Sequence, residues 1–352
     1  MTEYLITFVG DTSFGENYRS RLNGEDLIKS KGRAYSLQGV APLLLASDLV
    51  VANLETPLTQ QKNSLLEGHK KYIHWSDPVE SPRVLKEHNI SVVSLANNHT
   101  VDCGIQALAE TFESLEKNQI KWFGAGLTAL DAQRPYRKKV TVGDKNLPLV
   151  VIGAFEYRSV YKHRYGFYAN GDSPGVNRLT INRISNQIER LKSKTPQPFV
   201  IVYPHWGENY DWHSSEQALQ ARTMAEAGAD LIVGHGAHML GGIERIGAAW
   251  TLYSLGNLVF NSPGGYSKHN APPYSLIACM RIKAEAEAIS IELRLYPILT
   301  DNQLTDFQSR PVNEQEIIEI VQLMQSHSAS VPIETFGLHH DRFGYYFEIP
   351  IW

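Results

Sequence analysis

The feature that most constrains this chain is a regular alternation of short apolar runs with segments of helical periodicity. The apolar runs predict buried strands at residues 4–9, 49–52, 90–95, 149–154, 199–203, 231–233, 250–254 and 276–282. Helices are predicted at residues 42–46, 81–88, 104–117, 181–194, 214–227 and 313–326. Short buried strands separated by helices favour sheets covered by helices, and the alternating stretch 288–295 adds antiparallel pairing. We therefore expect an α/β fold with mixed sheets.

Composition narrows the functional class. The 352 residues, 43% of them hydrophobic, suffice for one large α/β domain or two modest ones. A net charge of −4 offers no general attraction to nucleic acid or to an anionic membrane. There is no apolar run of about 18 residues, so no membrane span is expected. The opening "MTEYLITFVGD" does not read as a signal peptide, which predicts a cytoplasmic protein, and Cys103 and Cys279 form neither a disulfide framework nor a CxxC site.

Polar side chains follow six of the predicted strands. In chain order they are Asp11; Asn53 and Glu55; Asn98, His99 and Asp102; His205 and Glu208; His235 and His238; and Asn257. In α/β sheets, ligands bind beyond the carboxyl ends of the strands. Carboxylate, carboxamide and imidazole groups are the donors that suit Mn, Fe or Zn, and a mixture of this kind is what a two-metal hydrolytic centre requires.

Each of these motifs alone has an ordinary structural explanation. Asp11 could be a turn or cap residue, His205 a satisfied core histidine, and Asn97 and Asn98 the centres of Asx turns. The sequence has no GxGxxG after the first strand and no GxxxxGK[ST], which removes the common nucleotide-binding loops. The recurrence of polar groups at strand ends, rather than any one of them, predicts a metal centre.

Six stretches resemble one known family. They are "GDTSF" (10–14), "SDLVVANLETPLT" (47–59), "SLANNHTVDCG" (94–104), "HWGENYD" (205–211), "AGADLIVGHGAHMLGGIE" (227–244) and "LYSLGNLVF" (252–260). The sequence resembles the CapA-type capsule-synthesis proteins of poly-γ-glutamate biosynthesis, relatives of the calcineurin-like metallophosphoesterases. The resemblance implies a four-layer α/β/β/α sandwich with two mixed sheets. It would span residues 1–300, with residues 301–352 as an extension packed on the same domain.

The resemblance also implies roles for single residues. One or two divalent metals (Mn, Fe or Zn) would be held by Asp11, Glu55, Asn98, His205, His235 and His238. His99 would be the catalytic histidine beside Asn98. Asp102, three residues later, could orient the imidazole and favour its protonated form. The first-block histidine of the metallophosphoesterases is absent, because Ser13 stands there. The capsule family's usual GHHPH reads GHGAH, with Gly236 in place of a histidine.

The function expected first is a metal-dependent hydrolase in which metal-bound hydroxide attacks a phosphoester and His99 is the acid or base. Hydrolysis or transfer at a γ-glutamyl or peptide amide is an alternative, and so is a non-catalytic protein that binds an anionic polymer or serves as a scaffold. The expected partner is a small molecule or an acidic polymer, not nucleic acid, and a homo-oligomer is possible. The candidate substrate-binding residues are Asn53, Glu208, Asn257, Arg158 and Arg164, the two arginines lying in the basic, aromatic stretch "FEYRSVYKHRYGFY", which would otherwise be a solvated loop.

Overall fold

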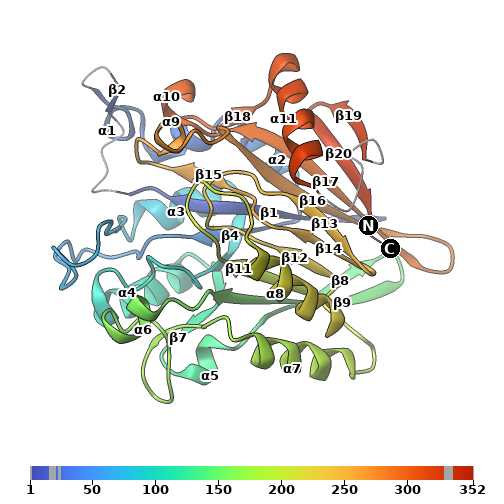
Figure 1. Ribbon diagram of the computed structural model, residues 1–352, viewed down its shortest axis with the longest axis horizontal. Coiled ribbons are helices and arrows are strands. Elements are labelled where there is room, and N and C mark those ends of the chain that lie inside the picture. Colours follow the sequence, from blue (N-terminus) through green and yellow to red (C-terminus); the bar gives the residue numbers. More distant parts are fainter. Residues whose placement is uncertain (1, 16–20, 23–24, 329–335, 352) are drawn as a thin grey trace.

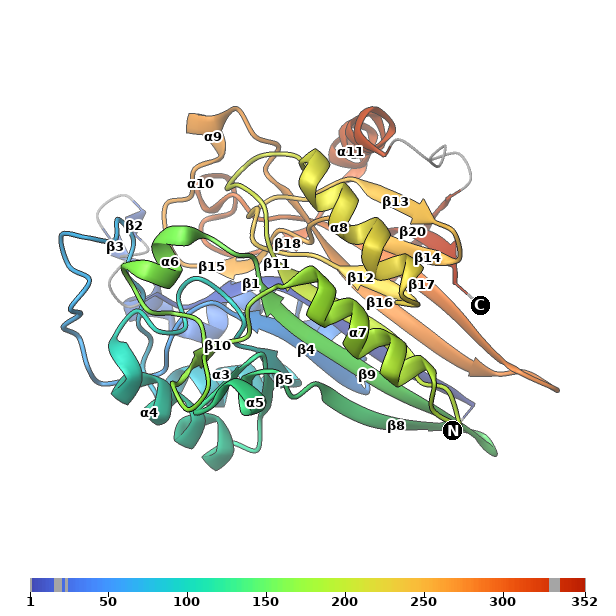
Figure 2. The ribbon, with the colours of Figure 1, turned by 60° about the horizontal axis from the view of Figure 1, so that its bottom comes forward.

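Two large sheets face each other in the computed structural model, which describes residues 2–15, 21–22, 25–328 and 336–351 (Figures 1 and 2). The larger sheet has the order β19 (Gly337–Asp341), β20 (Gly344–Pro350), β17 (Ile289–Leu299), β16 (Tyr274–Ala284), β1 (Glu3–Ser13), β4 (Leu49–Leu54), β5 (Ile90–Ser94) and β6 (Lys121–Phe123). In addition, β15 (Asn257–Phe260) pairs with β1, and β18 (Arg310–Pro311) pairs with β17.

The second sheet has the order β13 (Ile243–Ile246), β14 (Ala249–Leu252), β12 (Leu231–Val233), β11 (Phe199–His205), β9 (Lys145–Phe155) and β8 (Tyr136–Val142). Two short ribbons complete the strands, β7 (Ala125–Gly126) with β10 (Gly175–Val176) and β2 (Arg21–Leu22) with β3 (Glu25–Asp26). Both large sheets contain parallel and antiparallel pairs. The expected α/β class with mixed sheets is therefore confirmed.

The helices are α1 (Leu27–Lys31), α2 (Ala41–Leu45), α3 (Glu80–Glu87), α4 (Gly104–Lys117), α5 (Ala129–Ala132), α6 (Ser159–His163), α7 (Ile181–Lys192), α8 (Ser215–Glu226), α9 (Tyr266–His269), α10 (Asn302–Thr305) and α11 (Glu314–His327), with a 3-10 turn η1 (Arg33–Leu37). All six predicted helices are present, with ends within two residues of those expected. Capping boxes explain two of the starts: Ser214 with Gln217 begins α8, and Asn313 with Glu316 begins α11. No helix in the described ranges is long and apolar enough to cross a bilayer.

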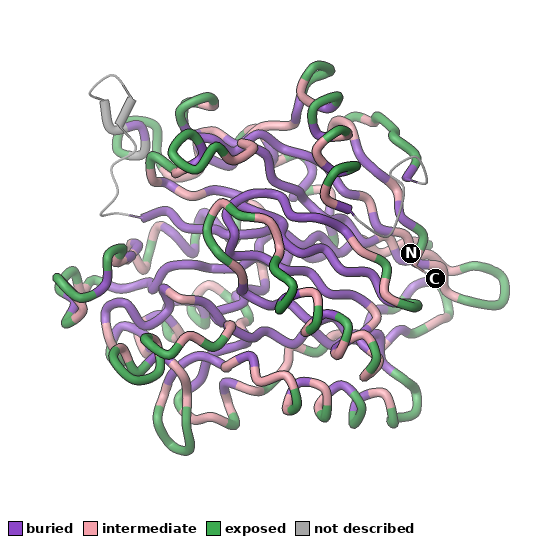
Figure 3. The backbone as a smooth tube through the Cα atoms, in the orientation of Figure 1, coloured by how far each residue is buried: buried purple, intermediate pink, exposed green. Residues whose placement is uncertain are grey.

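Three apolar clusters hold these elements together. The first fills the space between the two sheets, where Phe8 and Val51 of one sheet meet Ile201 and Leu252 of the other. The second lies under α2, α3 and α4 on the larger sheet, and the third lies under α7 and α8 on the smaller one. The strands are accordingly buried along most of their length, while the helices and loops carry the exposed residues (Figure 3).

The strand pairing brings the polar strand ends to one place. Parallel pairs β1–β4–β5 and β9–β11–β12 direct their carboxyl ends toward the same region between the sheets. The sequence predicted that the first strand ends at residue 9, but β1 continues to Ser13. It does so because the unpredicted strand β15 pairs in parallel with its last residues, opposite Asp11 and Thr12. Asp11 therefore lies within a strand, at a register shift, rather than in the loop that follows it.

Candidate metal centre

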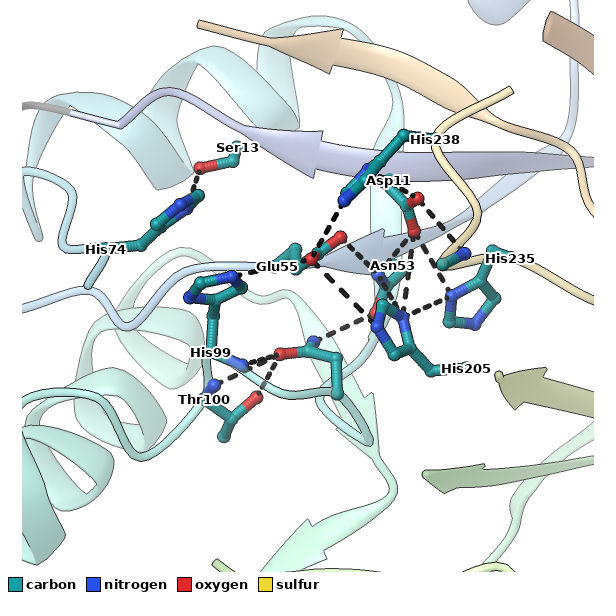
Figure 4. A network of polar contacts seen from close by, with 12 residues as sticks. Asp11, Ser13, Asn53, Glu55, His74, His99, Thr100, His205, His235 and His238 are labelled. Carbon is teal, nitrogen blue, oxygen red and sulfur yellow. Dashed lines mark hydrogen bonds and ion pairs between the residues drawn. The ribbon is translucent and has the colours of Figure 1, made fainter. Parts of the chain in front are cut away.

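Asp11 lies at the middle of the polar cluster between the sheets (Figure 4). Its carboxylate is fully buried; Oδ1 is 3.3 Å from Nδ1 of His235 and 3.8 Å from Nδ1 of His205. Oδ2 is 3.2 Å from Nδ1 of His238 and accepts a hydrogen bond of 3.1 Å from the backbone N–H of Gly236. One carboxylate thus lies close to three imidazoles of the smaller sheet, one at the end of β11 and two in the loop after β12.

Glu55 follows β4 directly, and its Oε1 atom is buried without a hydrogen-bond partner. This oxygen is 3.8 Å from Nε2 of His99 and 4.0 Å from Nε2 of both His205 and His238. An unpartnered buried carboxylate oxygen is costly unless a cation meets it. Separations close to 4 Å also match two ligands that face each other across an ion bound at about 2 Å.

The histidines at the ends of β11 and β12 also face each other. His205 is the final residue of β11, and His235 follows β12; their Nδ1 atoms are only 3.0 Å apart. Ligand atoms lie within 4.8 Å of one another in two groups, Asp11–His205–His235 and Asp11–Glu55–His238. These oxygen and nitrogen donors fit a divalent metal of the Mn, Fe or Zn type at one or two positions, and Asp11 belongs to both groups.

Asn97 and Asn98 have different environments. Asn97 is buried and shapes the turn after β5, because its Oδ1 accepts from the backbone N–H groups of His99 (3.0 Å) and Thr100 (3.1 Å). Its Nδ2 donates to Oδ1 of Asn53 at 2.9 Å. Asn98 is half-buried, next to the Tyr161 hydroxyl, and its Oδ1 has no hydrogen-bond partner. Asn97 thus matches the turn role expected for it, while Asn98 offers a free carboxamide oxygen.

His99 is held at the edge of the cluster by two charged groups. Its Nδ1 is 2.6 Å from Oδ2 of Asp102, as the three-residue spacing predicted. The structure adds Lys70, which was not predicted: its Nζ donates to Oδ1 of Asp102 at 2.5 Å and is 3.0 Å from Nδ1 of His99. All three side chains are buried. The Nε2 atom of His99 is left pointing at Glu55.

His74 is a second residue that sequence reasoning missed. Its ring stacks on His99 with centroids 3.7 Å apart, and its Nδ1 is 3.3 Å from Oγ of Ser13. Ser13 stands where the family pattern has a histidine, so an imidazole from another loop lies beside that position. His74 and Lys70 both come from the polar stretch 58–76, which lies between β4 and α3. Nothing in that stretch distinguishes the buried Lys70 from the exposed Lys71 beside it.

The two carboxylates of the cluster have pKa values that are shifted in opposite directions. Burial alone would raise the pKa of Asp11, but hydrogen bonds from His235 and His238 hold it well below its usual range. Burial and the neighbouring charge of Asp11 raise the pKa of Glu55 well above its usual range. Burial, followed by the charge of Lys70, lowers the pKa of His99. Asp102 was expected to favour the protonated form of His99, and this expectation is wrong. It did not include the buried Lys70, whose positive charge offsets the negative charge of Asp102.

Asn53 and Asn257, expected near the substrate, instead hold the candidate ligands. Nδ2 of Asn53 donates to Oδ1 of Asp11 at 2.9 Å and is 3.3 Å from Nδ1 of His205. Oδ1 of Asn257 is 3.0 Å from Nδ1 of His238. Both side chains are buried and form hydrogen bonds with other protein groups. Groups in this position contact the metal ligands rather than the metal, and they fix the orientation of those ligands.

The three charged residues expected to bind substrate are engaged elsewhere. Arg158 forms an ion pair with Glu156, donates to the carbonyl of Gly207 at 2.6 Å and is 3.2 Å from Glu208, whose side chain is 76% exposed. Nη2 of Arg164 is 2.9 Å from Nδ1 of His69 on the exposed surface. Arg158 thus links two loops, and neither arginine is among the contacts of the cluster.

The chain is similar to several known proteins. Residues 5–262 match the family described as bacterial capsule synthesis protein PGA_cap. The chain is 35% identical to the PGA biosynthesis protein CapA of Bacillus subtilis over 72% of its own length, and 30% identical to the capsule biosynthesis protein CapA of Bacillus anthracis over 76%. It spans 63% and 62% of the length of these relatives. A solved structure of a phosphatase from Mycoplasma pneumoniae aligns over 86% of this chain and 95% of that one, with 13% identity and a TM-score of 0.45.

The family match includes every candidate ligand, from Asp11 on β1 to His238 after β12, together with His99 and Asp102. The matched region ends just after β15, the strand that completes the surroundings of Asp11. The chain therefore belongs to the bacterial capsule synthesis protein PGA_cap family.

Proposed function

We propose that this protein is a metal-dependent hydrolase that cleaves a phosphoester, with His99 as the proton-transfer residue. The observation that carries the proposal is the position of His99. Its Nδ1 is tied to Asp102, and its Nε2 faces the unpartnered Oε1 of Glu55 at 3.8 Å. An oriented imidazole at the edge of a buried cluster of carboxylates and histidines is the arrangement that general acid–base catalysis requires.

Asp11, Glu55, Asn98, His205, His235 and His238 would hold one or two divalent ions. A bound ion would supply Lewis acidity toward a substrate oxygen and would lower the pKa of a water. The chain itself supplies the proton path. Asp102 holds the Nδ1 side of His99, so proton exchange with the leaving group takes place at Nε2, on the cluster side. Asn53 and Asn257 keep Asp11 and His238 in place during this exchange.

Amide hydrolysis or transfer is the second candidate, and one observation favours it. The Bacillus subtilis relative is named for PGA biosynthesis, so an amide-linked acidic polymer is a reasonable substrate class for this chain as well. The same cluster suits both reactions, because a carbonyl oxygen and a phosphoryl oxygen are polarised in the same way. A non-catalytic role is the third reading, and the experiment below separates all three.

The test begins with elemental analysis of the purified protein, followed by assays of phosphomonoesters, phosphodiesters and γ-glutamyl amides with Mn²⁺, Fe²⁺ or Zn²⁺. We expect bound metal and turnover of at least one phosphoester. The His99→Gln variant should lose turnover by about 10²-fold or more while keeping its metal. The exposed histidine variant His163→Gln is the matched control and should behave as wild type.

Each other outcome has a definite meaning. Turnover of amides alone would replace the phosphoester proposal with the second candidate. A protein that neither contains nor takes up a divalent metal would exclude a hydrolase of this type. Loss of metal in His99→Gln would make His99 a ligand instead of the proton-transfer residue.

A further inference from the structure

A polar cavity of about 540 Å³ lies away from the candidate metal centre, between α5 and the start of α7. The loop between α6 and β10 closes it on the side of Gly166 and Ser173. In Figure 2 these elements lie at the lower end of the smaller sheet, below α6. Three cationic side chains, Lys162, Arg178 and Arg183, line the cavity, and none of its lining residues is acidic.

The hydrogen bonds of the two arginines go to neutral groups. Arg178 donates from Nε to Oγ1 of Thr180 at 2.9 Å, and its guanidinium lies 5.4 Å from the centre of the Tyr157 ring. Arg183 donates from Nη2 to Oδ1 of Asn177 at 2.8 Å and to the carbonyl of Arg178. Throughout the described part of the chain, neither arginine forms an ion pair within 4.0 Å, in contrast to Arg158.

Two further observations concern the environment of Arg183. The Nη1 atom of Arg183 is buried and has no hydrogen-bond partner, which is costly for a charged donor. Burial and the charge of Arg178 lower the pKa of Arg183, so the two guanidinium groups repel each other across the cavity wall. An oxyanion in the cavity would relieve this repulsion.

The cavity also borders the metal cluster through one residue pair. The carbonyl of Asn177, a lining residue, accepts the backbone N–H of Phe155 at 2.8 Å, at the end of β9. The Phe155 ring packs edge-on against His205, with centroids 5.6 Å apart. An anionic group in the cavity would therefore lie on the flank of the candidate metal centre rather than in it.

We propose that this cavity is an anion-binding site that takes a carboxylate or phosphate group of an acidic ligand through Arg178, Arg183 and Lys162. Guanidinium groups bind both kinds of oxyanion in a planar, two-pronged manner, while the flexible lysine adds charge at the rim. The twelve-residue helix α7 begins at Ile181, beside both arginines, and its first turn adds a favourable field for an anion. The site goes beyond the proposed hydrolysis and does not depend on it.

The experiment is a calorimetric titration of the full-length protein, as purified and at low salt, with two probes. Inorganic phosphate represents a phosphate group, and a short glutamate oligomer represents the carboxylates of an acidic polymer. The variants are Arg178→Gln and Lys162→Gln, and Arg183→Gln is read only where its thermal unfolding matches wild type. The matched control is Arg190→Gln, an exposed arginine on the same helix α7 that does not line the cavity.

We expect at least one probe to bind wild type and Arg190→Gln equally, and to bind Arg178→Gln about tenfold more weakly, since a hydrogen bond to a charged group is lost. Lys162→Gln should weaken binding less and should reduce its dependence on salt. Binding of phosphate alone identifies a phosphate site, and binding of the oligomer alone identifies a carboxylate site. The proposal is overturned if neither probe binds, or if both Arg178→Gln and Lys162→Gln bind as wild type does. Because no turnover is measured, this outcome is independent of the hydrolase proposal.

Discussion

At the residue scale, the chemistry of His99 rests on a buried ion pair. Asp102 accepts hydrogen bonds from Nζ of Lys70 and from the backbone N–H of His74 at 2.7 Å, besides its contact with His99. The side chains of Lys70 and Asp102 are 5% and 0% exposed, so bulk water solvates neither charge. A buried pair of this kind adds little net stability, but removing one partner leaves the other uncompensated.

The first prediction concerns Lys70. The Lys70→Met variant should lose about 3 kcal/mol of unfolding free energy, because Asp102 is left as a lone buried charge. Its turnover should fall by about tenfold or more with metal content unchanged, because His99 loses its positioning. Denaturant unfolding, elemental analysis and kinetics on the proposed substrates measure the three quantities. Lys71→Met, at the exposed neighbouring position, is the control, and wild-type stability in Lys70→Met would contradict the prediction.

The second prediction concerns the pH dependence of metal uptake. Because the pKa of Glu55 is raised above its ordinary 4.5, the carboxyl keeps its proton in the metal-free protein at a pH where it is normally ionised. A metal ion must displace that proton, so affinity should rise with pH, by at most about tenfold per pH unit, until Glu55 ionises unaided. Asp11, His205 and His235 contribute little, because their lowered pKa values leave them already deprotonated.

Calorimetric titration of chelator-treated protein with Zn²⁺ or Mn²⁺ at several pH values tests this. The Glu55→Gln variant should bind metal more weakly and without the pH dependence. The stability of the metal-free protein depends on pH with the opposite sign. It should fall as pH rises from about 4.5 to the raised pKa of Glu55, and bound metal should remove that loss. A wild-type affinity that stays constant with pH would contradict both statements.

At the element scale, the pairing of β1 with β15 brings Asp11 to the cluster. Gly10 precedes Asp11, and a Cβ atom at Gly10 would lie 1.8 Å from the carbonyl oxygen of Gly256, which itself accepts the N–H of Asp11 at 2.8 Å. The close approach of the two backbones therefore requires glycine at this position. The pairing of β15 with β1, and with it the position of the Asp11 carboxylate, therefore requires that residue 10 has no side chain.

The third prediction follows from this close approach. The Gly10→Ala variant should lose about 3 kcal/mol of unfolding free energy, because the new methyl group must push β1 and the turn before β15 apart. It should also bind less metal, since Asp11 moves with the strand. Thermal or denaturant unfolding and elemental analysis test both effects. Gly68→Ala, at a site with open space and a φ of 73°, should cost only about 1 kcal/mol and leave the metal content intact; equal effects in the two variants would contradict the prediction.

The sequence could predict the part of this site that lies at strand ends, but not the part that lies in loops. The candidate ligands at the ends of β1, β4, β11 and β12 could be found, because apolar runs mark strands and polar residues mark their ends. Lys70 and His74 could not, because they lie in a loop without periodicity, and their burial depends on tertiary packing. The pairing of Arg158 with Glu156 was equally invisible in the basic stretch that follows β9.

At the scale of the whole molecule, three strands of the C-terminal segment, β18, β19 and β20, belong to the larger sheet. The sequence expected residues 301–352 to pack on the main domain as an extension, and showed only one helix and an aromatic segment there. In the structure, β18 and β20 both pair with β17, and Phe347 and Ile349 of β20 are buried in the core between the sheets. Ile320 and Met324 of α11 belong to the same core. We propose that residues 2–351 form one folding unit.

The last prediction tests this unity. A chain that ends at residue 300 should fail to unfold cooperatively and should bind the apolar dye ANS, because removal of β20 exposes the edge of β17 and opens the core that Phe347 and Ile349 fill. The double variant Phe347→Ala/Ile349→Ala keeps the full chain and should lose about 5 kcal/mol or more of unfolding free energy. Leu338→Ala, on the exposed face of β19, should change stability by less than about 1 kcal/mol and is the control. A truncated chain that unfolds cooperatively at the wild-type temperature would instead make residues 301–352 a separable extension.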